Sequence, residues 1–408
     1  MKAAILTLGN EVLAGKTLNT NSQFLSKSLN GLGFDVVEQL TIPDDEAMII
    51  TAVKRLLKDV TLLITTGGLG PTYDDITIAS IARALGRELV FHEEVIRDIE
   101  EKFKRFHRKM GENNRSQAYF PAESVVLPNA VGTAPGMYLE HGSKIIIALP
   151  GPPRENIPMF DNETRPLLEA LQNKPIYLED LVIFGIGESD VEDRVKEGVR
   201  VPDGLRLATY VKPLYVTLRL TSTDKTLIQD TVEDLEKLFG DSVVGRNDCL
   251  LEEKVQQLLK KTGRTLSVAE SCTGGLIASM LVSVPGSSEI FDGGFIVYSN
   301  DYKSRELGVA PEVISKEGAV SEAVARLMVE GLYQRSGSDY CLGITGIAGP
   351  TGETPDKRVG LTFIALKTPD RTLVRQFQFF GDRNTIRLRG ALNALNMLRL
   401  EIVEMALE

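Results

Sequence analysis

The chain has 408 residues, of which 43% are hydrophobic and 25% charged, a composition typical of globular proteins that excludes a largely disordered chain. Its 46 Lys and Arg residues against 56 Asp and Glu residues give a net charge of −10, which argues against general affinity for nucleic acid. No uncharged apolar run approaches the roughly 18 residues that span a bilayer, and the start of the chain shows no cleavable signal pattern. We therefore expect a cytoplasmic protein of two or three domains with no membrane partner.

Cysteine and histidine usage narrows the possible chemistry. Three scattered cysteines, Cys249, Cys272 and Cys341, are too few for a disulfide framework or a zinc site. The last of three histidines is His141, so the rest of the chain must work without an imidazole of its own.

Strands and helices alternate in the first 150 residues, which predicts a parallel sheet in an α/β domain. The hydrophobic pattern places strands at 3–8, 35–41, 60–66 and 144–149 and helices at 20–31, 45–57 and 76–85.

The next segment has a different order of expected elements, β-α-β-β-α, which suits a small α+β module. Its strands are expected at 178–184 and 214–221 and its helices at 189–197 and 225–239. Ten Lys and Arg against fifteen Asp and Glu between residues 171 and 248 leave this module with a net charge of −5. A third α/β unit has expected strands at 265–269, 294–298, 340–345, 361–367 and 374–380, and helices at 250–261, 275–284, 322–334 and 384–407.

The first candidate site is the run 65–75, Thr-Thr-Gly-Gly-Leu-Gly-Pro-Thr-Tyr-Asp-Asp, between a buried-type strand and a helix. In an open parallel sheet, ligands bind beyond the carboxyl ends of strands, where glycines let backbone N–H groups approach a phosphate. Asp74 and Asp75 then stand where a hard cation would bridge carboxylate and phosphate oxygens. The alternative is a tight turn in which one of the two aspartates merely caps the helix.

Two further polar loops follow strand ends, and all three loops are expected at one rim. They are Gly9-Asn10-Glu11 with Asn19-Thr20-Asn21, and the run 149–155, Leu-Pro-Gly-Pro-Pro-Arg-Glu. Together with residues 67–75 they resemble the molybdopterin-binding (MoaB/MogA-like) domain in the form found at the N-terminus of the CinA family.

That resemblance implies metal-dependent hydrolysis of ADP-ribose to AMP and ribose 5-phosphate. Because the chain has no Nudix box, the expected ligands of the divalent metal (Mg, Mn or Co) are Asp74, Asp75 and Glu11, with Asp74 and Asp75 also catalytic. The expected substrate-binding residues are Asn19, Asn21, Gly67, Gly68, Gly70 and Thr72.

The second candidate site is the run 267–276, Ser-Val-Ala-Glu-Ser-Cys-Thr-Gly-Gly-Leu, which again leads from a strand into a helix. Unpaired N–H groups at the helix start would favour an oxyanion or a phosphate. Ser271 as a simple helix cap is the alternative.

Several ordered motifs in this third unit resemble the C-terminal CinA domain, whose activity is deamidation of nicotinamide mononucleotide (NMN). Besides residues 269–275 they are Tyr298-Ser299-Asn300, Lys303, residues 318–321 and 346–350, and Gly381-Asp382-Arg383. The two resemblances together cover nearly the whole chain.

Deamidation of NMN needs a nucleophile, a base, an oxyanion site and groups that bind the phosphate. No histidine lies in this third unit to act as the base. The resemblance implies Ser271 as nucleophile and Lys303, with a lowered pKa, as base, with Tyr298 relaying or orienting and an oxyanion site near Thr273. Cys272 is a rival nucleophile, and the alternative for Lys303 and Arg387 is an ordinary solvated or ion-paired surface position. The expected substrate-binding residues are Gly274, Gly275, Gly346, Ala348, Gly349, Arg383 and Arg387, with Arg389 as another possible phosphate ligand; no cofactor is expected.

We therefore expect three domains: 1–168 (MoaB/MogA-like), 169–248 (KH-like) and 249–408 (CinA deamidase). The middle segment lacks the Gly-x-x-Gly loop of nucleic-acid-binding KH domains, the nearest string being Gly185-Ile186-Gly187-Glu188, so we expect a spacer or dimerisation role and a homodimer. The predicted function is a bifunctional pyridine-nucleotide salvage hydrolase acting on NMN and ADP-ribose. A non-catalytic nucleotide-binding accessory protein in DNA uptake and a molybdopterin-binding protein are the alternatives.

Overall fold

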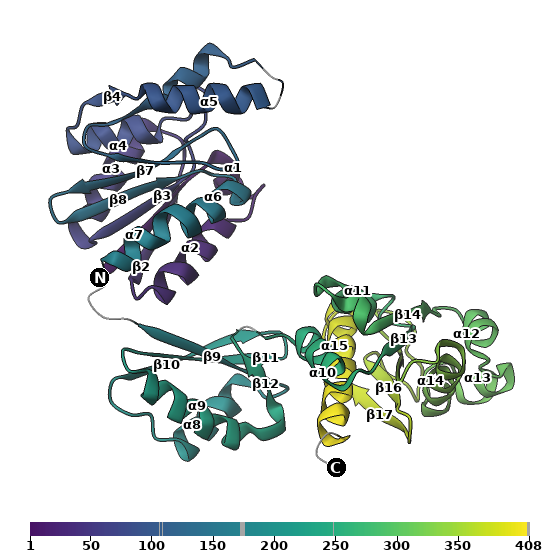
Figure 1. Cartoon of the computed structure of the whole chain (residues 1–408). Coiled ribbons are helices and arrows are strands. Elements are labelled where there is room, and N and C mark those ends of the chain that lie inside the picture. Colours follow the sequence, from purple (N-terminus) through teal and green to yellow (C-terminus); the bar gives the residue numbers. More distant parts are fainter. Residues whose placement is uncertain (106, 108, 172–175, 248, 406–408) are drawn as a thin grey trace. The chain divides into compact units, whose positions relative to one another are not determined.

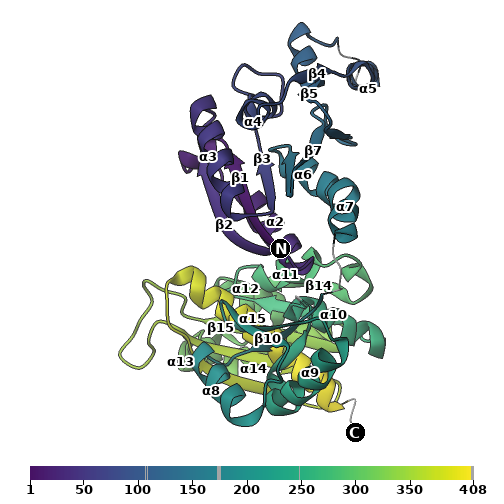
Figure 2. The same cartoon turned by 90° about the vertical axis from the view of Figure 1, so that its left-hand side faces the viewer.

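The computed structural model describes residues 1–105, 107, 109–171, 176–247 and 249–405. They form two compact units, Met1–Tyr177 and Leu178–Glu408, which we describe separately (Figures 1 and 2). Among the described residues, none of the helices combines the length and apolar character that a membrane span requires.

A six-stranded sheet forms the centre of the first unit, in the order β2-β1-β3-β8-β7-β6. The first four strands pair in parallel, as expected, and β7 and β6 extend this parallel sheet at one edge with antiparallel pairing. Short hairpin connections make this possible, because β7 turns back directly into β8. The strands are β1 (Lys2–Leu8), β2 (Asp35–Ile42), β3 (Leu62–Thr66), β6 (Val125–Leu127), β7 (Gly136–His141) and β8 (Lys144–Leu149).

Helices cover both faces of this sheet (Figure 1). Alternate residues of β1 face opposite layers, so Ala4, Leu6 and Leu8 pack with α3, α4 and α5, whereas Ala3 and Ile5 pack with α2, η2 and α7. The helices are α1 (Asn10–Leu13), α2 (Thr20–Gly31), α3 (Glu46–Asp59), α4 (Thr77–Leu85), α5 (Glu93–Arg105), α6 (Pro153–Met159), the π-helix η2 (Phe160–Thr164) and α7 (Arg165–Ala170).

An excursion between α4 and β6 has no counterpart in the expected elements. It contains the two-stranded sheet of β4 (Leu89–Phe91) and β5 (Tyr119–Pro121), with α5 and the 3₁₀ helix η1 (Glu112–Ala118) between them. The strands have only three residues each, too few to give a clear alternating pattern in sequence.

The second unit begins with the expected small α+β module. Its four-stranded sheet has the order β10-β11-β9-β12, and β12 is an addition to the expected order. The elements are β9 (Tyr177–Phe184), α8 (Glu188–Gly198), β10 (Leu205–Lys212), β11 (Tyr215–Ser222), α9 (Lys225–Phe239), the 3₁₀ helix η3 (Gly240–Ser242) and β12 (Val243–Arg246).

The rest of the second unit is built on the five-stranded sheet β14-β13-β15-β16-β17, parallel in its first three strands and antiparallel in the last two. The strands are β13 (Leu266–Glu270), β14 (Phe291–Ile296), β15 (Tyr340–Gly346), β16 (Leu361–Lys367) and β17 (Thr372–Gln378).

One face of this sheet packs against α10, α11 and α15, and the other packs against α12, α13 and α14 (Figure 1). The helices are α10 (Leu251–Thr262), α11 (Leu276–Ser283), the 3₁₀ helix η4 (Ser287–Glu289), α12 (Asn300–Leu307), α13 (Pro311–Glu317), α14 (Glu322–Ser336) and α15 (Arg383–Met405). The expected end of the last helix at Leu407, and the expected domain ends at 248 and 408, lie outside the described residues.

Buried polar contacts join the small module to the sheet domain within this unit. Arg399 of α15 is only 4% exposed and donates a hydrogen bond to the carbonyl of Val243 and another to that of Asp241. The Leu251 N–H donates to the Tyr215 hydroxyl at 3.3 Å, so the start of α10 is fixed to β11.

Candidate functional site

The glycine loop after β3 adopts a backbone that other residues rarely take. Gly67 and Gly68 have φ values of 106° and 66°, and a Cβ atom at Gly67 would lie 2.2 Å from the carbonyl oxygen of Leu8. Glycine is therefore required sterically here. Thr77 at the start of α4 holds the loop, since its hydroxyl donates to the Gly67 carbonyl at 2.9 Å.

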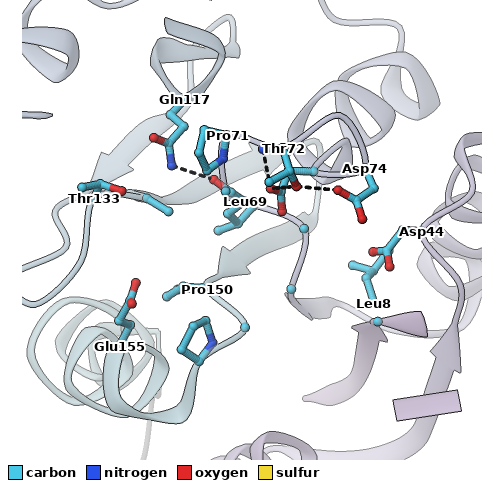
Figure 3. A pocket seen from close by; sticks show the side chains of 18 of the residues that line it. Leu8, Asp44, Leu69, Pro71, Thr72, Asp74, Gln117, Thr133, Pro150 and Glu155 are labelled. Atoms are coloured by element: carbon cyan, nitrogen blue, oxygen red, sulfur yellow. Dashed lines mark hydrogen bonds between the residues drawn. The ribbon is translucent and has the colours of Figure 1, made fainter. Parts of the chain in front are cut away.

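This loop forms one wall of a cavity of about 380 Å³ (Figure 3). The cavity is also lined by Gly9 and Glu11 after β1 and by residues 150–152, so these loops meet the glycine loop as expected, whereas residues 19–21 do not line it. Its acidic lining residues are Glu11, Asp44, Asp74, Asp75 and Glu155.

Asp74 and Asp75 do not cap the helix that follows them. The residue that precedes α4 is Ile76, which makes no side-chain cap. Asp75 instead accepts from the Thr72 N–H at 2.8 Å and from the Thr72 hydroxyl at 2.6 Å, and Asp74 also contacts that hydroxyl (Figure 3). Thr72 thus orders both aspartates at the cavity, and the helix-cap alternative is wrong.

Asp44 is an acidic group of this cavity that the sequence analysis missed. It lies between β2 and α3, on the same side of the cavity as Asp74 (Figure 3). Burial raises its pKa, and the negative charges of Glu11, Asp74 and Asp75 raise it further, against a hydrogen bond from the Asn10 N–H that lowers it. The cavity therefore carries negative charge that its own residues leave uncompensated.

Asn19 and Asn21 lie outside this cavity, beside a smaller one of about 60 Å³. Asn19 caps α2 by accepting from the Ser22 N–H, and its amide donates to the Thr7 hydroxyl. The Asn21 amide donates to the Gly151 carbonyl at 2.7 Å and to the Thr66 hydroxyl at 2.9 Å. Both asparagines thus fasten α2 to strand ends and loops.

The donor chemistry of the acidic cavity fits a hard divalent cation. Within the described ranges no group of three or more His, Cys, Asp or Glu side chains forms a metal cage by itself. Mg²⁺ needs no such cage, because it is held by one or two carboxylates, waters and the phosphates of a substrate. Asp74 and Asp75, ordered by Thr72, can supply such carboxylates, and the repulsion at Asp44 favours cation uptake.

The second site centres on Ser271 and Lys303, which are 32 positions apart in the sequence. Ser271 lies on the turn that leaves β13, and Lys303 lies in the first turn of α12. The Lys303 Nζ atom is 2.9 Å from Ser271 Oγ, 2.8 Å from the Val297 carbonyl oxygen and 3.1 Å from the Tyr298 carbonyl oxygen.

Lys303 is 1% exposed, so the alternative of a solvated surface ammonium is wrong. Burial lowers the pKa of Lys303 to about 8. A neutral amine has two N–H groups and one lone pair. The ammonium form of Lys303 donates to Ser271 Oγ, and once the amine is neutral, with the two carbonyls accepting from its N–H groups, its lone pair would face the Ser271 hydroxyl as a general base requires.

Cys272 is poorly placed to compete as the nucleophile. Cys272 lines the same cavity as Ser271 and is equally exposed, at 7%, but burial raises the pKa of its thiol to about 12. Since the thiolate is the reactive form, a thiol with this pKa is almost entirely unreactive at neutral pH.

Glu270 is a further residue that the sequence analysis missed. Its fully buried carboxylate accepts from the N–H groups of Gly275 (3.0 Å), Ile277 (3.1 Å) and Ala278 (2.9 Å). The helix start expected to grip an anion is therefore already occupied by a carboxylate of the chain. Gly275 occupies the cap position of α11, so Ser271 is not its helix cap.

The cavity at Ser271 has a volume of about 230 Å³ and brings together several of the expected residues. Arg383, a lining residue, links the loop after β15 to the segment after β14, because its guanidinium donates to the Gly349 carbonyl at 2.7 Å and to the Tyr298 hydroxyl at 2.9 Å. The Tyr298 phenol thus contacts Arg383, whereas its backbone carbonyl contacts Lys303. The lining residues are Ser271, Cys272, Tyr298, Asn300, Lys303, Ala319, Val320, Thr345, Gly346, Ala348 and Arg383.

Arg387 and Thr273, two other predicted site residues, contact each other beside the turn that follows Ser271. Arg387 donates to the Thr273 carbonyl from Nε (3.2 Å) and Nη2 (2.7 Å), which braces the turn after Ser271. The Thr273 side chain is fully buried, and its hydroxyl makes no hydrogen bond in the described part of the chain. The predicted site residues of this domain that do not line the cavity are Thr273, Gly274, Gly275, Gly349, Arg387 and Arg389.

Comparison with known proteins identifies the family. Residues 249–402 match the family described as "CinA C-terminal domain", residues 4–170 match "Probable molybdopterin binding domain", and residues 179–245 match "Damage-inducible protein CinA KH domain". A "CinA-like protein" of Kosmotoga olearia is 44% identical over 405 residues that cover 98% of each chain. The chain belongs to the CinA family.

A second relative of full length agrees with this assignment. A CinA-like protein of Dictyoglomus thermophilum is 43% identical over 405 residues, again 98% of each chain. A crystal structure of a competence/damage inducible protein from Agrobacterium tumefaciens has 38% identity and a TM-score of 0.36, covering 37% of this chain and 93% of its own. Membership of the family, and the expected mixture of MoaB/MogA-like, KH-like and CinA domains, are thus confirmed.

Proposed function

We propose that the C-terminal domain of this CinA family member hydrolyses the carboxamide of NMN to nicotinic acid mononucleotide and ammonia. The observation that carries the proposal is the contact between the buried amine of Lys303 and the Ser271 hydroxyl. A serine paired with a lysine of lowered pKa is a known means of activating a hydroxyl without histidine.

In this mechanism neutral Lys303 accepts the Ser271 proton while Oγ attacks the carboxamide carbon. The resulting ammonium returns the proton to the leaving nitrogen, and ammonia departs as the acyl-serine forms. Water then attacks the acyl-serine with Lys303 again as base, which releases the carboxylate product and restores Ser271. The N–H groups of the turn at Cys272 and Thr273 are the donors best placed by sequence to stabilise the oxyanion.

For the N-terminal domain we propose metal-dependent hydrolysis of the ADP-ribose diphosphate. The supporting observation is the acidic cavity beside the glycine loop, with Asp74 and Asp75 ordered by Thr72. A bound divalent cation would neutralise diphosphate charge and lower the pKa of the attacking water. Asp74 and Asp75 would hold that cation, and the backbone of Gly67 and Gly68 would contact phosphate.

Two assays on the full chain test both proposals. Ammonia release from NMN should persist in Cys272→Ala and disappear in Ser271→Ala; release that survives Ser271→Ala contradicts the serine mechanism. AMP release from ADP-ribose should require Mg²⁺ and Asp75. A protein that binds both nucleotides without turnover would instead be a nucleotide-binding accessory protein, and retention of molybdopterin rather than ADP-ribose would indicate a molybdopterin-binding protein.

A further inference from the structure

The turn after β13, residues 271–275, is held by contacts from three different elements. The Ser271 N–H donates to the Ile344 carbonyl in β15 at 3.0 Å. The Glu270 carboxylate, at the end of β13, accepts from the Gly275 N–H at 3.0 Å. The third contact comes from α15, where the Arg387 guanidinium donates to the Thr273 carbonyl from two of its nitrogens. The turn is therefore fixed at its start, its middle and its end.

Two N–H groups of this turn, those of Cys272 and Thr273, donate to no group in the described part of the chain. They are therefore available to an oxyanion that forms on a substrate at Ser271. Thr273 has only two soft backbone torsions, so a fixed carbonyl restricts the direction of its N–H. We propose that Arg387 is a positioning residue that holds these N–H groups for the oxyanion, an inference that rests on the proposed deamidase function.

The rest of the α15 face that carries Arg387 supports this role. Arg383, Arg387 and Gly390 are spaced i, i+4 and i+7, which places them on one face of the helix. Arg383 lines the cavity. Gly390 is buried, and a Cβ atom there would lie 2.9 Å from Ile344 Cδ1 and 3.8 Å from Thr273 Cγ2. The α15 backbone thus packs closely against both the turn and the strand that accepts the Ser271 N–H.

The contacts of Arg387 argue against the substrate-binding role expected from the sequence. All three guanidinium nitrogens donate within the chain, Nε (3.2 Å) and Nη2 (2.7 Å) to the Thr273 carbonyl and Nη1 (3.4 Å) to Asn384 Oδ1. The side chain does not line the cavity. Its charge still acts at the turn: burial raises the pKa of the Cys272 thiol, and the positive charges of Lys303 and Arg387 oppose this rise. The same charge would stabilise an oxyanion beside Cys272 and Thr273.

The test measures ammonia release from NMN by the full chain. Arg387→Ala should lower kcat by at least about tenfold and change KM by less than about twofold, because it disturbs the oxyanion donors and removes no group that binds the substrate. Inhibition by the product, nicotinic acid mononucleotide, should also change by less than about twofold. The matched control is Arg375→Ala, at an exposed arginine of β17, which should keep kcat and KM.

Rescue distinguishes positioning from general support of the fold. Guanidinium chloride below its denaturing concentration should restore part of kcat in Arg387→Ala and should not raise that of the wild type, since it replaces the missing donor at the Thr273 carbonyl. Arg387→Lys keeps the positive charge and should retain an intermediate kcat. If Arg387→Ala lowers the unfolding temperature, Arg387→Lys takes over the test, with a reduced kcat at unchanged KM as the expected result.

An unchanged kcat in Arg387→Ala would overturn the inference. So would a raised KM and weaker product inhibition at unchanged kcat, which would make Arg387 a phosphate ligand instead. In both cases the wild type still releases ammonia, so the proposed deamidase function stands. A wild type that releases no ammonia from NMN would overturn that function and this inference together.

Discussion

The Lys303 amine lies 2.9 Å from the Ser271 hydroxyl in a region where the lysine is only 1% exposed. Two backbone carbonyls accept its remaining hydrogen bonds, so no carboxylate compensates the ammonium form at these contacts. Burial lowers the pKa of this amine to about 8, so near neutral pH a larger fraction of it is in the neutral form that a general base requires than in an exposed lysine.

Deamidation should rise with pH as Lys303 loses its proton. Because burial lowers the pKa of Lys303 to about 8, kcat/KM for NMN should increase tenfold per pH unit well below pH 8 and level off above it. A pH profile of ammonia release checks this. A flat profile between pH 6 and about 9 would contradict a lysine base.

Replacing Lys303 by Met should separate activity from stability. The pKa of Lys303 falls from 10.5 to about 8 on folding, so the unfolded chain binds more protons between these values. The contribution of Lys303 to the free energy of unfolding is therefore least favourable below pH 8 and recovers as pH rises toward 10.5. At pH 7 we expect Lys303→Met to unfold at an equal or higher temperature while kcat falls by at least about 10²-fold. A large loss of stability at pH 7 would contradict this view of the buried amine.

Glu270 should position the nucleophile through its contacts with the start of α11. Glu270→Ala removes the acceptor of three N–H groups and should cost about 2–4 kcal/mol of unfolding free energy. Glu270→Gln keeps part of these bonds and should restore most stability, with kcat lowered more than KM is raised. Denaturant unfolding and NMN kinetics distinguish this from a purely structural residue, for which Glu270→Gln would recover activity and stability together.

Asp44→Asn should stabilise the metal-free protein. The pKa of Asp44 is raised by burial first and then by neighbouring carboxylates, so its ionisation opposes folding as pH rises through the folded pKa. At pH 7 without metal we expect a higher unfolding temperature, and in Mg²⁺ a lower rate of ADP-ribose cleavage. If the variant is less stable without metal, the proposed repulsion among Asp44, Asp74 and Asp75 is wrong.

Chelation of metal should act on one activity alone. EDTA should abolish cleavage of ADP-ribose and leave ammonia release from NMN unchanged, since the proposed Ser271–Lys303 mechanism uses no cation. Asp75→Asn should have the same selective effect, with Asp59→Asn as a control carboxylate at the end of α3. Loss of both activities on chelation would mean that the deamidase site also depends on metal.

The sequence predicted the strands that position both sites, because buried strands and glycine loops leave strong local patterns. It could not show that Lys303 is buried, since lysine is ordinarily solvated and only the fold brings it to Ser271. It missed Asp44, which stands beside the helix-capping Asp45 and does not differ from it in local pattern. It missed the hydrogen bonds by which Glu270 holds the start of α11. The expected strand ended at Ala269, and the N–H groups that donate to Glu270 lie at the cap and in the first turn of the following helix.

The most direct measurement is mass spectrometry of the full chain after acid quench of a reaction with NMN. The account predicts an acyl adduct on the peptide that contains Ser271, present in Cys272→Ala and absent from Ser271→Ala and Lys303→Met. An adduct on Cys272, or ammonia release that persists in Ser271→Ala, would contradict it.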